Sequence, residues 1–193
     1  MSTPLTIGVL AIQGDFAAHA AALRSLGATA VEVRKPAQLD ALDGLIIPGG
    51  ESTTILRFLH RDGLFDALAA FAQSRPTFGT CAGCILLAKE VTHPAQRSLA
   101  AMDIPVQRNA YGRQHDSAIL SAPSELPGPP LEMVFIRAPR ITRTGPAVQI
   151  LARRGDDPVL VRSGHLLAAT FHPEMTPDPR VHSYFLDIVR TQK

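Results

Sequence analysis

Two cysteines, Cys81 and Cys84, are the residues whose type and spacing most directly suggest chemistry in this chain. Their C-x-x-C spacing is shared by redox dithiols and by half of many zinc sites. Cys81 also lies at the centre of GTCAG at residues 79–83, the pattern of a nucleophile turn between a strand and a helix. Such a turn lifts the sulfur out of the sheet, and the helix N-terminus favours the thiolate. The stretch therefore allows three interpretations: a nucleophile, a thiol-disulfide pair, or an inert buried cysteine.

A cysteine nucleophile needs a base, and HPE at residues 172–174 offers one together with a group to orient it. Residues two apart on an extended segment point to the same side, so His172 and Glu174 can share a face. Glu174 would fix the tautomer of His172 and leave the second ring nitrogen for Cys81. An isolated HPE also suits a simple turn before a helix. Chemistry is favoured because GTCAG and HPE both follow apolar strands, whose carboxyl ends form the active-site edge of an α/β sheet.

A glycine pair forms a third motif, PGGEST at residues 48–53. Glycines after a buried strand can point backbone N–H groups into a site, as stabilisation of an oxyanion requires. A glycine pair is also common in ordinary turns. No Lys-Ser or Lys-Thr follows at the spacing of a phosphate-binding loop, so that role is not favoured.

Periodicity predicts the elements that position these motifs. The first half alternates between apolar strands and amphipathic helices, which predicts a mostly parallel sheet. The second half holds short alternating runs separated by Gly and Pro, which predicts further strands, several of them antiparallel. Residues 121–130 are turn-rich and predict an exposed loop, and Ser163 and Gly164 predict the turn of a hairpin. The predicted strands are residues 5–12, 29–35, 44–48, 76–79, 102–109, 131–138, 147–153, 158–164 and 165–171, and the predicted helices are 16–27, 52–63, 64–74, 82–90 and 178–190.

Length and composition limit the class of protein. A chain of 193 residues with 46% hydrophobic and 19% charged residues predicts one globular domain over residues 1–193. A net charge of +2, scattered basic residues and the absence of tryptophan argue against a nucleic-acid partner. The first apolar run is too short to span a membrane and lacks a preceding basic region, so we expect a cytoplasmic protein.

Taken together, the motifs resemble the class I glutamine amidotransferases, which carry a Cys-His-Glu triad on an α/β sheet. Within that class the chain is similar to the glutaminase subunits of pyridoxal 5'-phosphate synthase. The resemblance covers nearly the whole chain in six ordered blocks: AIQGDF at residues 11–16, PGGESTT at 48–54, GTCAG at 79–83, RNAYGRQ at 108–114, FIRAPRI at 135–141 and HPE at 172–174.

This resemblance implies the fold, the activity and the site. The implied fold is one three-layer α/β domain, flavodoxin-like, with helices flanking a mostly parallel sheet that has an antiparallel extension. The implied reaction is hydrolysis of L-glutamine through a thioester on Cys81, with His172 as acid and base and Glu174 as its orienter. No metal or cofactor is implied. The implied glutamine contacts are Gly49, Gly50, Glu51, Arg108, Ile136 and Arg137, and the implied oxyanion hole is the backbone N–H of Gly50 and of Ala82.

The resemblance also implies a partner, a (β/α)₈ barrel synthase subunit that receives the ammonia. Gln13, in the first loop, is then a candidate for coupling partner docking to oxyanion-hole formation. Two residues depart from the family pattern: Cys84 replaces a bulky aliphatic residue, and Ala118 replaces an aromatic one. We expect Cys84 to point into the core as a small apolar residue. The alternatives are a glutaminase subunit serving a different synthase, a C-x-x-C redox protein, and a non-catalytic binding module on the same fold.

Overall fold

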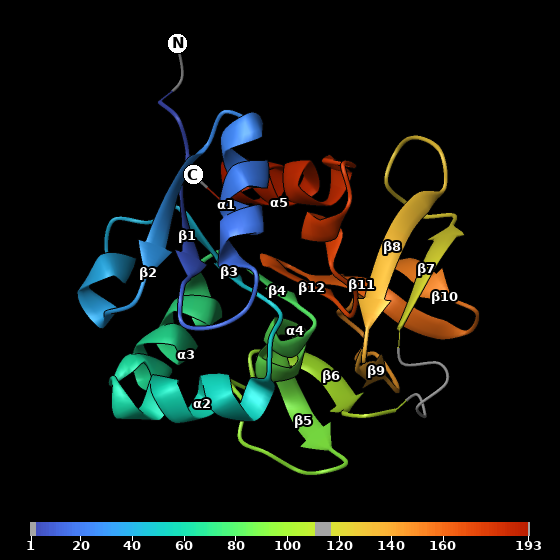
Figure 1. Ribbon diagram of the computed structural model, residues 1–193, viewed down its shortest axis with the longest axis horizontal. Helices are drawn as coiled ribbons and strands as arrows, with labels where there is room; N and C mark the ends of the chain where they lie inside the picture. Colours follow the sequence, from blue (N-terminus) through green and yellow to red (C-terminus); the bar gives the residue numbers. More distant parts are fainter. Residues whose placement is uncertain (1–2, 111–116, 193) are drawn as a thin grey trace.

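A seven-stranded sheet forms the centre of the protein in the computed structural model, which describes residues 3–110 and 117–192 (Figure 1). Its strand order is β10-β11-β12-β4-β3-β1-β2. The five strands from β12 to β2 are parallel, and β11 and β10 extend the sheet antiparallel beside β12. The strands are β1 Thr6–Leu10, β2 Thr29–Val33, β3 Gly44–Ile47, β4 Thr77–Thr80, β10 Gln149–Arg154, β11 Asp157–Ser163 and β12 Leu166–Ala169.

Helices cover both faces of this sheet and create two hydrophobic cores. Helices α1 (Phe16–Ser25) and α5 (Arg180–Thr191) lie on one face, and α2 (Ser52–Arg61), α3 (Leu64–Ser74) and α4 (Ala82–Leu87) lie on the other (Figure 1). Strand β3 contributes side chains to both cores. Leu45 and Ile47 pack in the core beneath α2 to α4, whereas Ile46 packs in the core beneath α1 and α5. A strand buried on both faces reads as a continuous apolar run, as GLII does.

Two small sheets lie beside the carboxyl ends of the parallel strands. The first contains β5 (Ala88–Thr92), β6 (Met102–Gln107) and β9 (Arg140–Ile141), and the second is the hairpin of β7 (Ser117–Ala122) and β8 (Leu131–Ile136). Short 3-10 helices cover Pro36–Leu39 (η1) and Pro173–Met175 (η2). Within the described ranges, no helix is both long enough and apolar enough to cross a membrane.

The structure confirms the predicted fold class and corrects three local predictions. The helix predicted for residues 82–90 ends at Leu87, because Ala88 is extended and begins a strand paired with β6. The loop predicted for residues 121–130 starts two residues later, since Ser121 and Ala122 still pair with β8. The turn predicted at Ser163 and Gly164 lies one residue further on, because Ser163 pairs with Leu166. Residues 111–114 of the RNAYGRQ block lie outside the described residues.

Candidate active site

Cys81 occupies the apex of a tight turn between β4 and α4. Its backbone is strained, with φ 48° and ψ −103°, a conformation rare outside functional turns. The Cys81 N–H donates to the Ala169 carbonyl oxygen of β12 at 2.8 Å, which holds the turn against the sheet. A Cβ on Gly83 would lie 2.0 Å from the Ile47 carbonyl oxygen, and one on Gly79 would lie 2.5 Å from the Gly83 carbonyl. Both glycines are therefore required for the close packing of this turn.

His172 and Glu174 follow β12, the strand next to β4, and lie beside Cys81. His172 Nδ1 is 2.7 Å from Glu174 Oε1, and the His172 backbone N–H donates to the Val134 carbonyl oxygen of β8 at 2.8 Å. Burial by itself lowers the pKa of His172, but hydrogen bonds with Cys81 and with Glu174 outweigh burial and raise this pKa to about 10. A cationic His172 beside Cys81 is the kind of neighbour that activates a cysteine nucleophile.

The glycine loop after β3 packs tightly against both of these side chains. A Cβ on Gly49 would lie 2.4 Å from His172 Cε1 and 3.3 Å from Cys81 Cβ, so the absence of a side chain leaves room for the cysteine and histidine pair. On its other side the Gly49 carbonyl oxygen faces Gly14, whose added Cβ would lie only 1.7 Å from it. The loop is thus fixed between the first loop of the chain and the cysteine turn.

Glu51 and Arg108 form a charged pair at the entrance to the site. The Glu51 carboxylate caps α2 by accepting hydrogen bonds from the backbone N–H groups of Thr53 and Thr54, and Arg108 Nη2 lies 3.3 Å from Oε1. Partial burial raises the pKa of Glu51, but these bonds and those from the two threonine hydroxyls outweigh burial and lower it to about 2. The Glu51 backbone N–H also donates to Gln13 Oε1 at 3.3 Å.

A cavity of about 500 Å³ opens over Cys81 and brings most of the predicted residues together. The Glu174 side chain lies behind His172 and is fully buried, Gly49 packs against the pair, and Ala82 is the first residue of α4. The lining also includes four residues not named as contacts from the sequence: Ser52, Asn109 and Pro139 belong to the motif blocks PGGESTT, RNAYGRQ and FIRAPRI, and Ile85 lies in α4. The lining residues are Gln13, Gly50, Glu51, Ser52, Cys81, Ile85, Arg108, Asn109, Ile136, Arg137, Pro139 and His172.

Cys84 plays no part in this cavity. Its side chain is fully buried in the core beneath α2 to α4, as the sequence predicted. Burial and the charge of Cys81 raise the pKa of the Cys84 thiol, which keeps it protonated and unreactive. Both cysteines carry free thiols. Among the described residues, no cluster of three or more His, Cys, Asp or Glu side chains is arranged to hold a metal ion.

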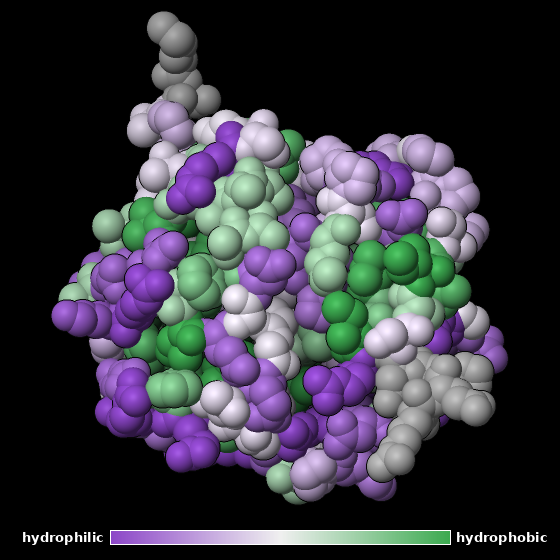
Figure 2. Space-filling view, in the orientation of Figure 1, coloured by the Kyte–Doolittle hydropathy of each residue, from purple (hydrophilic) through white to green (hydrophobic). Residues whose placement is uncertain are grey.

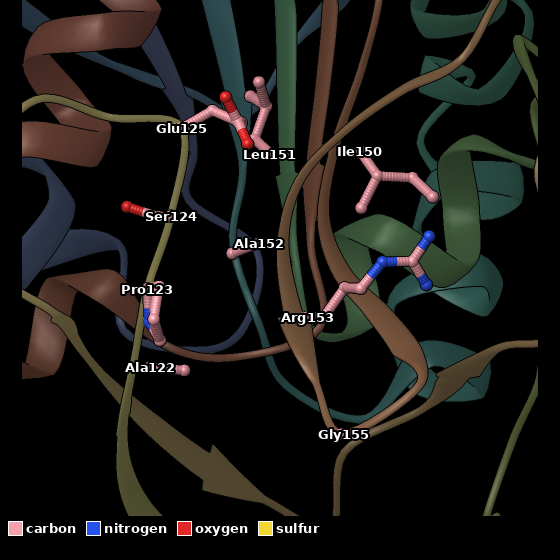
Figure 3. A pocket seen from close by; sticks show the side chains of 9 residues that line it. All are labelled: Ala122, Pro123, Ser124, Glu125, Ile150, Leu151, Ala152, Arg153 and Gly155. Atoms are coloured by element: carbon pink, nitrogen blue, oxygen red, sulfur yellow. The ribbon is translucent and has the colours of Figure 1, made fainter.

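A second hollow of similar size, about 510 Å³, lies against β10 at the far edge of the sheet (Figure 3). Its labelled side chains include Ser124, Glu125 and Arg153, whose Nη1 donates to the Asp156 carbonyl oxygen. Among the described residues that line the hollow there is no cysteine and no histidine. Nucleophilic chemistry is therefore assigned to the cavity over Cys81.

The fold and the site define a class I glutamine amidotransferase, in which a cysteine turn and a His-Glu pair share the carboxyl edge of a parallel sheet. Comparison with known proteins leads to the same class. The model of the SNO glutamine amidotransferase family matches residues 9–191, and the chain belongs to that family.

Individual relatives and solved structures support the same assignment. The chain is 58% identical over 186 residues to the pyridoxal 5'-phosphate synthase subunit PdxT of Koribacter versatilis, covering 96% of each chain. It is 53% identical to the subunit of the same name from Solibacter usitatus, covering 93% of this chain and 97% of the relative. A crystal structure of a glutamine amidotransferase matches with a TM-score of 0.88 and 48% identity, covering 95% of this chain and 98% of that one. These findings support the glutaminase interpretation of the chain and not the C-x-x-C redox alternative.

Proposed function

We propose that this chain hydrolyses L-glutamine to L-glutamate and ammonia at Cys81, within one domain spanning residues 1–193. The observation that carries the proposal is the strained, strand-to-helix position of Cys81 beside a buried His172 that is oriented by Glu174. Nucleophile, base and orienter thereby meet at one edge of the sheet. Family membership and the shared name of the most similar relatives reported above support the same reaction.

The proposed reaction starts from a Cys81 thiolate paired with the imidazolium of His172. The Cys81 thiolate attacks the side-chain amide carbon of glutamine, and the carbonyl electrons move onto oxygen. The N–H groups of Gly50 and Ala82 would stabilise that oxyanion, since Gly50 lies in the loop that lines the cavity and Ala82 follows Cys81 at the start of α4. Collapse breaks the C–N bond, and the leaving amine takes a proton from His172 and departs as ammonia. A water then attacks the thioester and gives its proton to His172, and a second collapse releases glutamate and restores the ion pair.

The cavity supplies groups for the amino-acid end of the substrate. We assign the α-carboxylate to the guanidinium groups of Arg108 and Arg137, since a planar fork can bind both oxygens of a carboxylate. Glu51 keeps its negative charge through its hydrogen bonds and is assigned to the α-ammonium group. Gly49, Gly50 and Ile136 contribute backbone and packing contacts around the substrate side chain.

The ammonia passes, in this proposal, to a pyridoxal 5'-phosphate synthase barrel subunit, as the name of the PdxT relatives suggests. Three apolar side chains of the β7–β8 hairpin are exposed, Ile119, Leu120 and Ile136, and Ile136 also lines the cavity. Together with the apolar surface that Figure 2 shows over this hairpin, they support a partner that docks beside the cavity. Gln13 is assigned to coupling, since its side chain touches the Glu51 backbone in the glycine loop. We place the activity in the cytoplasm, a reducing compartment in which free thiols persist.

One assay tests this proposal. Glutamate release from glutamine is measured for the native chain and for Cys81→Ser, each with and without the barrel subunit. We expect release by the native complex and none by the variant complex. No release by the native complex would refute the glutaminase assignment, whereas release that survives Cys81→Ser would refute only the choice of nucleophile.

A further inference from the structure

Three buried side chains behind the Cys81 site have no role in the mechanism above. His19 in α1 and His182 in α5 are almost completely buried, at 0% and 1% exposure, and Thr80 ends β4. His19 Nδ1 lies 2.9 Å from His182 Nε2, and His19 Nε2 lies 3.2 Å from Thr80 Oγ1. His19 Nε2 also lies 3.2 Å from Glu174 Oε2, so this cluster touches the carboxylate that orients His172.

The carboxylate of Glu174 depends on that contact. Its side chain is fully buried, and Oε1 is already engaged with His172. Oε2 makes no hydrogen bond within residues 3–110 and 117–192, and Nε2 of His19, which hydrogen-bonds with Thr80 Oγ1, lies 3.2 Å from it. A buried carboxylate oxygen without a donor is strongly disfavoured. Among the described residues, His19 is therefore the group positioned to stabilise the inner side of Glu174.

Hydrogen-bond roles along the cluster follow from the carboxylate. An ionised carboxylate only accepts, so His19 must carry its proton on Nε2. A neutral His19 then presents a lone pair at Nδ1, which requires the proton of His182 to be on Nε2. His182 thus selects the tautomer of His19 that can donate to Glu174, in the way that a carboxylate selects the tautomer of a histidine base.

Both histidines are held neutral by their surroundings. Burial lowers the pKa of His19 well below its ordinary value, and the nearby charges of His182 and of His172 lower it further. Burial also lowers the pKa of His182, to about 4. A neutral donor can fix the direction of the Glu174 carboxylate without cancelling its charge. The full negative charge then remains available to the imidazolium of His172.

We propose that His19 is a positioning residue of the glutaminase site, which holds the Glu174 carboxylate toward His172 by donating from Nε2 to Oε2, with His182 selecting the donating tautomer. The inference rests on the proposed function. His19 does not line the cavity over Cys81 and so has no contact with the substrate. Its effect is on kcat and on the stability of the thiolate and imidazolium pair, and not on glutamine binding.

Two amides of different length test this proposal. In His19→Gln the side-chain N–H group can reach the position of the histidine Nε2, whereas in His19→Asn the amide reaches only the position of Nδ1. His19→Asn therefore keeps a polar group beside His182 and loses the one beside Glu174, whereas His19→Gln keeps the one beside Glu174. His165→Asn is the matched control, because the ring of the half-buried His165 lies 3.0 Å from the Ala72 carbonyl oxygen and His165 precedes β12, at the opposite end of that strand from His172.

Glutaminase kinetics in the complex with the barrel subunit give the first measurement. Loss of a hydrogen bond to a charged group predicts a roughly 10- to 100-fold lower kcat for His19→Asn, with KM for glutamine within about threefold of native. His19→Gln is expected to retain kcat within about threefold, as is His165→Asn. Equal kcat values for the native chain and His19→Asn would overturn the proposal, as would a raised KM at unchanged kcat.

Alkylation of Cys81 by iodoacetamide, measured from pH 5 to pH 10, gives a second result that needs no turnover. The titratable groups around His19 are Glu174, His172 and His182; His172 contacts Cys81, and Glu174 acts on Cys81 through His172. We expect the alkylation midpoint of His19→Asn to rise by about one pH unit, and that of His19→Gln to match the native protein. A lowered melting temperature with an unchanged profile would show a structural role only. A native complex that releases no glutamate but alkylates normally would refute the proposed function and leave the positioning role of His19 standing on the alkylation result.

Discussion

Substitution of Gly14 by alanine tests whether the glycine loop must hold its present position for catalysis. Gly14 has φ +91°, and an added Cβ would lie 1.7 Å from the Gly49 carbonyl oxygen, half the 3.4 Å at which ordinary contacts begin. The Gly49 carbonyl oxygen belongs to the backbone, and the added Cβ is attached directly to the backbone at Gly14, so neither atom can rotate away as the end of a side chain would. The peptide between Gly49 and Gly50 must therefore move. Because the N–H of a trans peptide points opposite to its carbonyl, the Gly50 N–H must move with it.

The expected losses of stability and of kcat distinguish backbone strain from misplacement of the oxyanion donor. The positive φ alone costs about 1 kcal/mol for alanine, and the overlap adds about 1–3 kcal/mol. Misplacement of one oxyanion donor lowers kcat by roughly 10²- to 10³-fold. Gly27→Ala is the matched control, since Gly27 has φ +80° with no atom within 4 Å of an added Cβ. It should lose about 1 kcal/mol of stability, or roughly 2–4 °C of melting temperature, and keep native activity.

The assay compares thermal melting and glutamate release in the barrel complex for the native chain and both variants. A Gly14→Ala protein that is folded at the assay temperature and retains kcat within threefold of Gly27→Ala would refute the reasoning. That result would mean either that the loop can shift without cost or that the Gly50 N–H does not contribute to the reaction.

The remaining predictions concern three other residues. At neutral pH, iodoacetamide should modify Cys81 and leave Cys84 unlabelled, because Cys84 is buried and its pKa is raised; peptide mass spectrometry showing equal labelling would contradict this. Glu51 has a pKa lowered from 4.5 to about 2 in the folded protein, so its contribution to stability is present above pH 4.5 and lost as the pH falls toward 2. The difference in unfolding free energy between native protein and Glu51→Gln should therefore shrink over that interval, and a constant difference would be inconsistent with it. Gln13→Ala should reduce partner-stimulated glutaminase activity, and unchanged stimulation would exclude the coupling role.

Much of the fold follows from local patterns in the sequence. Continuous apolar runs such as GLII and alternating ones such as LEMVFI predict strands, because burial on both faces or on one face dictates these periods. The ends of the elements follow less well from the sequence. The helical pattern continues past Leu87, but the helix ends there because pairing with β6 stabilises the extended form of Ala88. The short strands β5, β7 and β9 were not predicted, since their pairing partners are distant or their patterns are weak.

The candidate chemistry follows from local sequence, because GTCAG, HPE and PGGEST each end an apolar strand and each residue type has a defined reactivity. The folded structure shows that β12, β4 and β3 are neighbours, which brings those three ends together although they are far apart in the chain. It also decided the role of His19, a single histidine in the alanine-rich helix FAAHAAALRS. Strand order and helix packing result from long-range burial, which local periodicity does not encode. For that reason the contact between His19 and Glu174 could be found only in the folded protein.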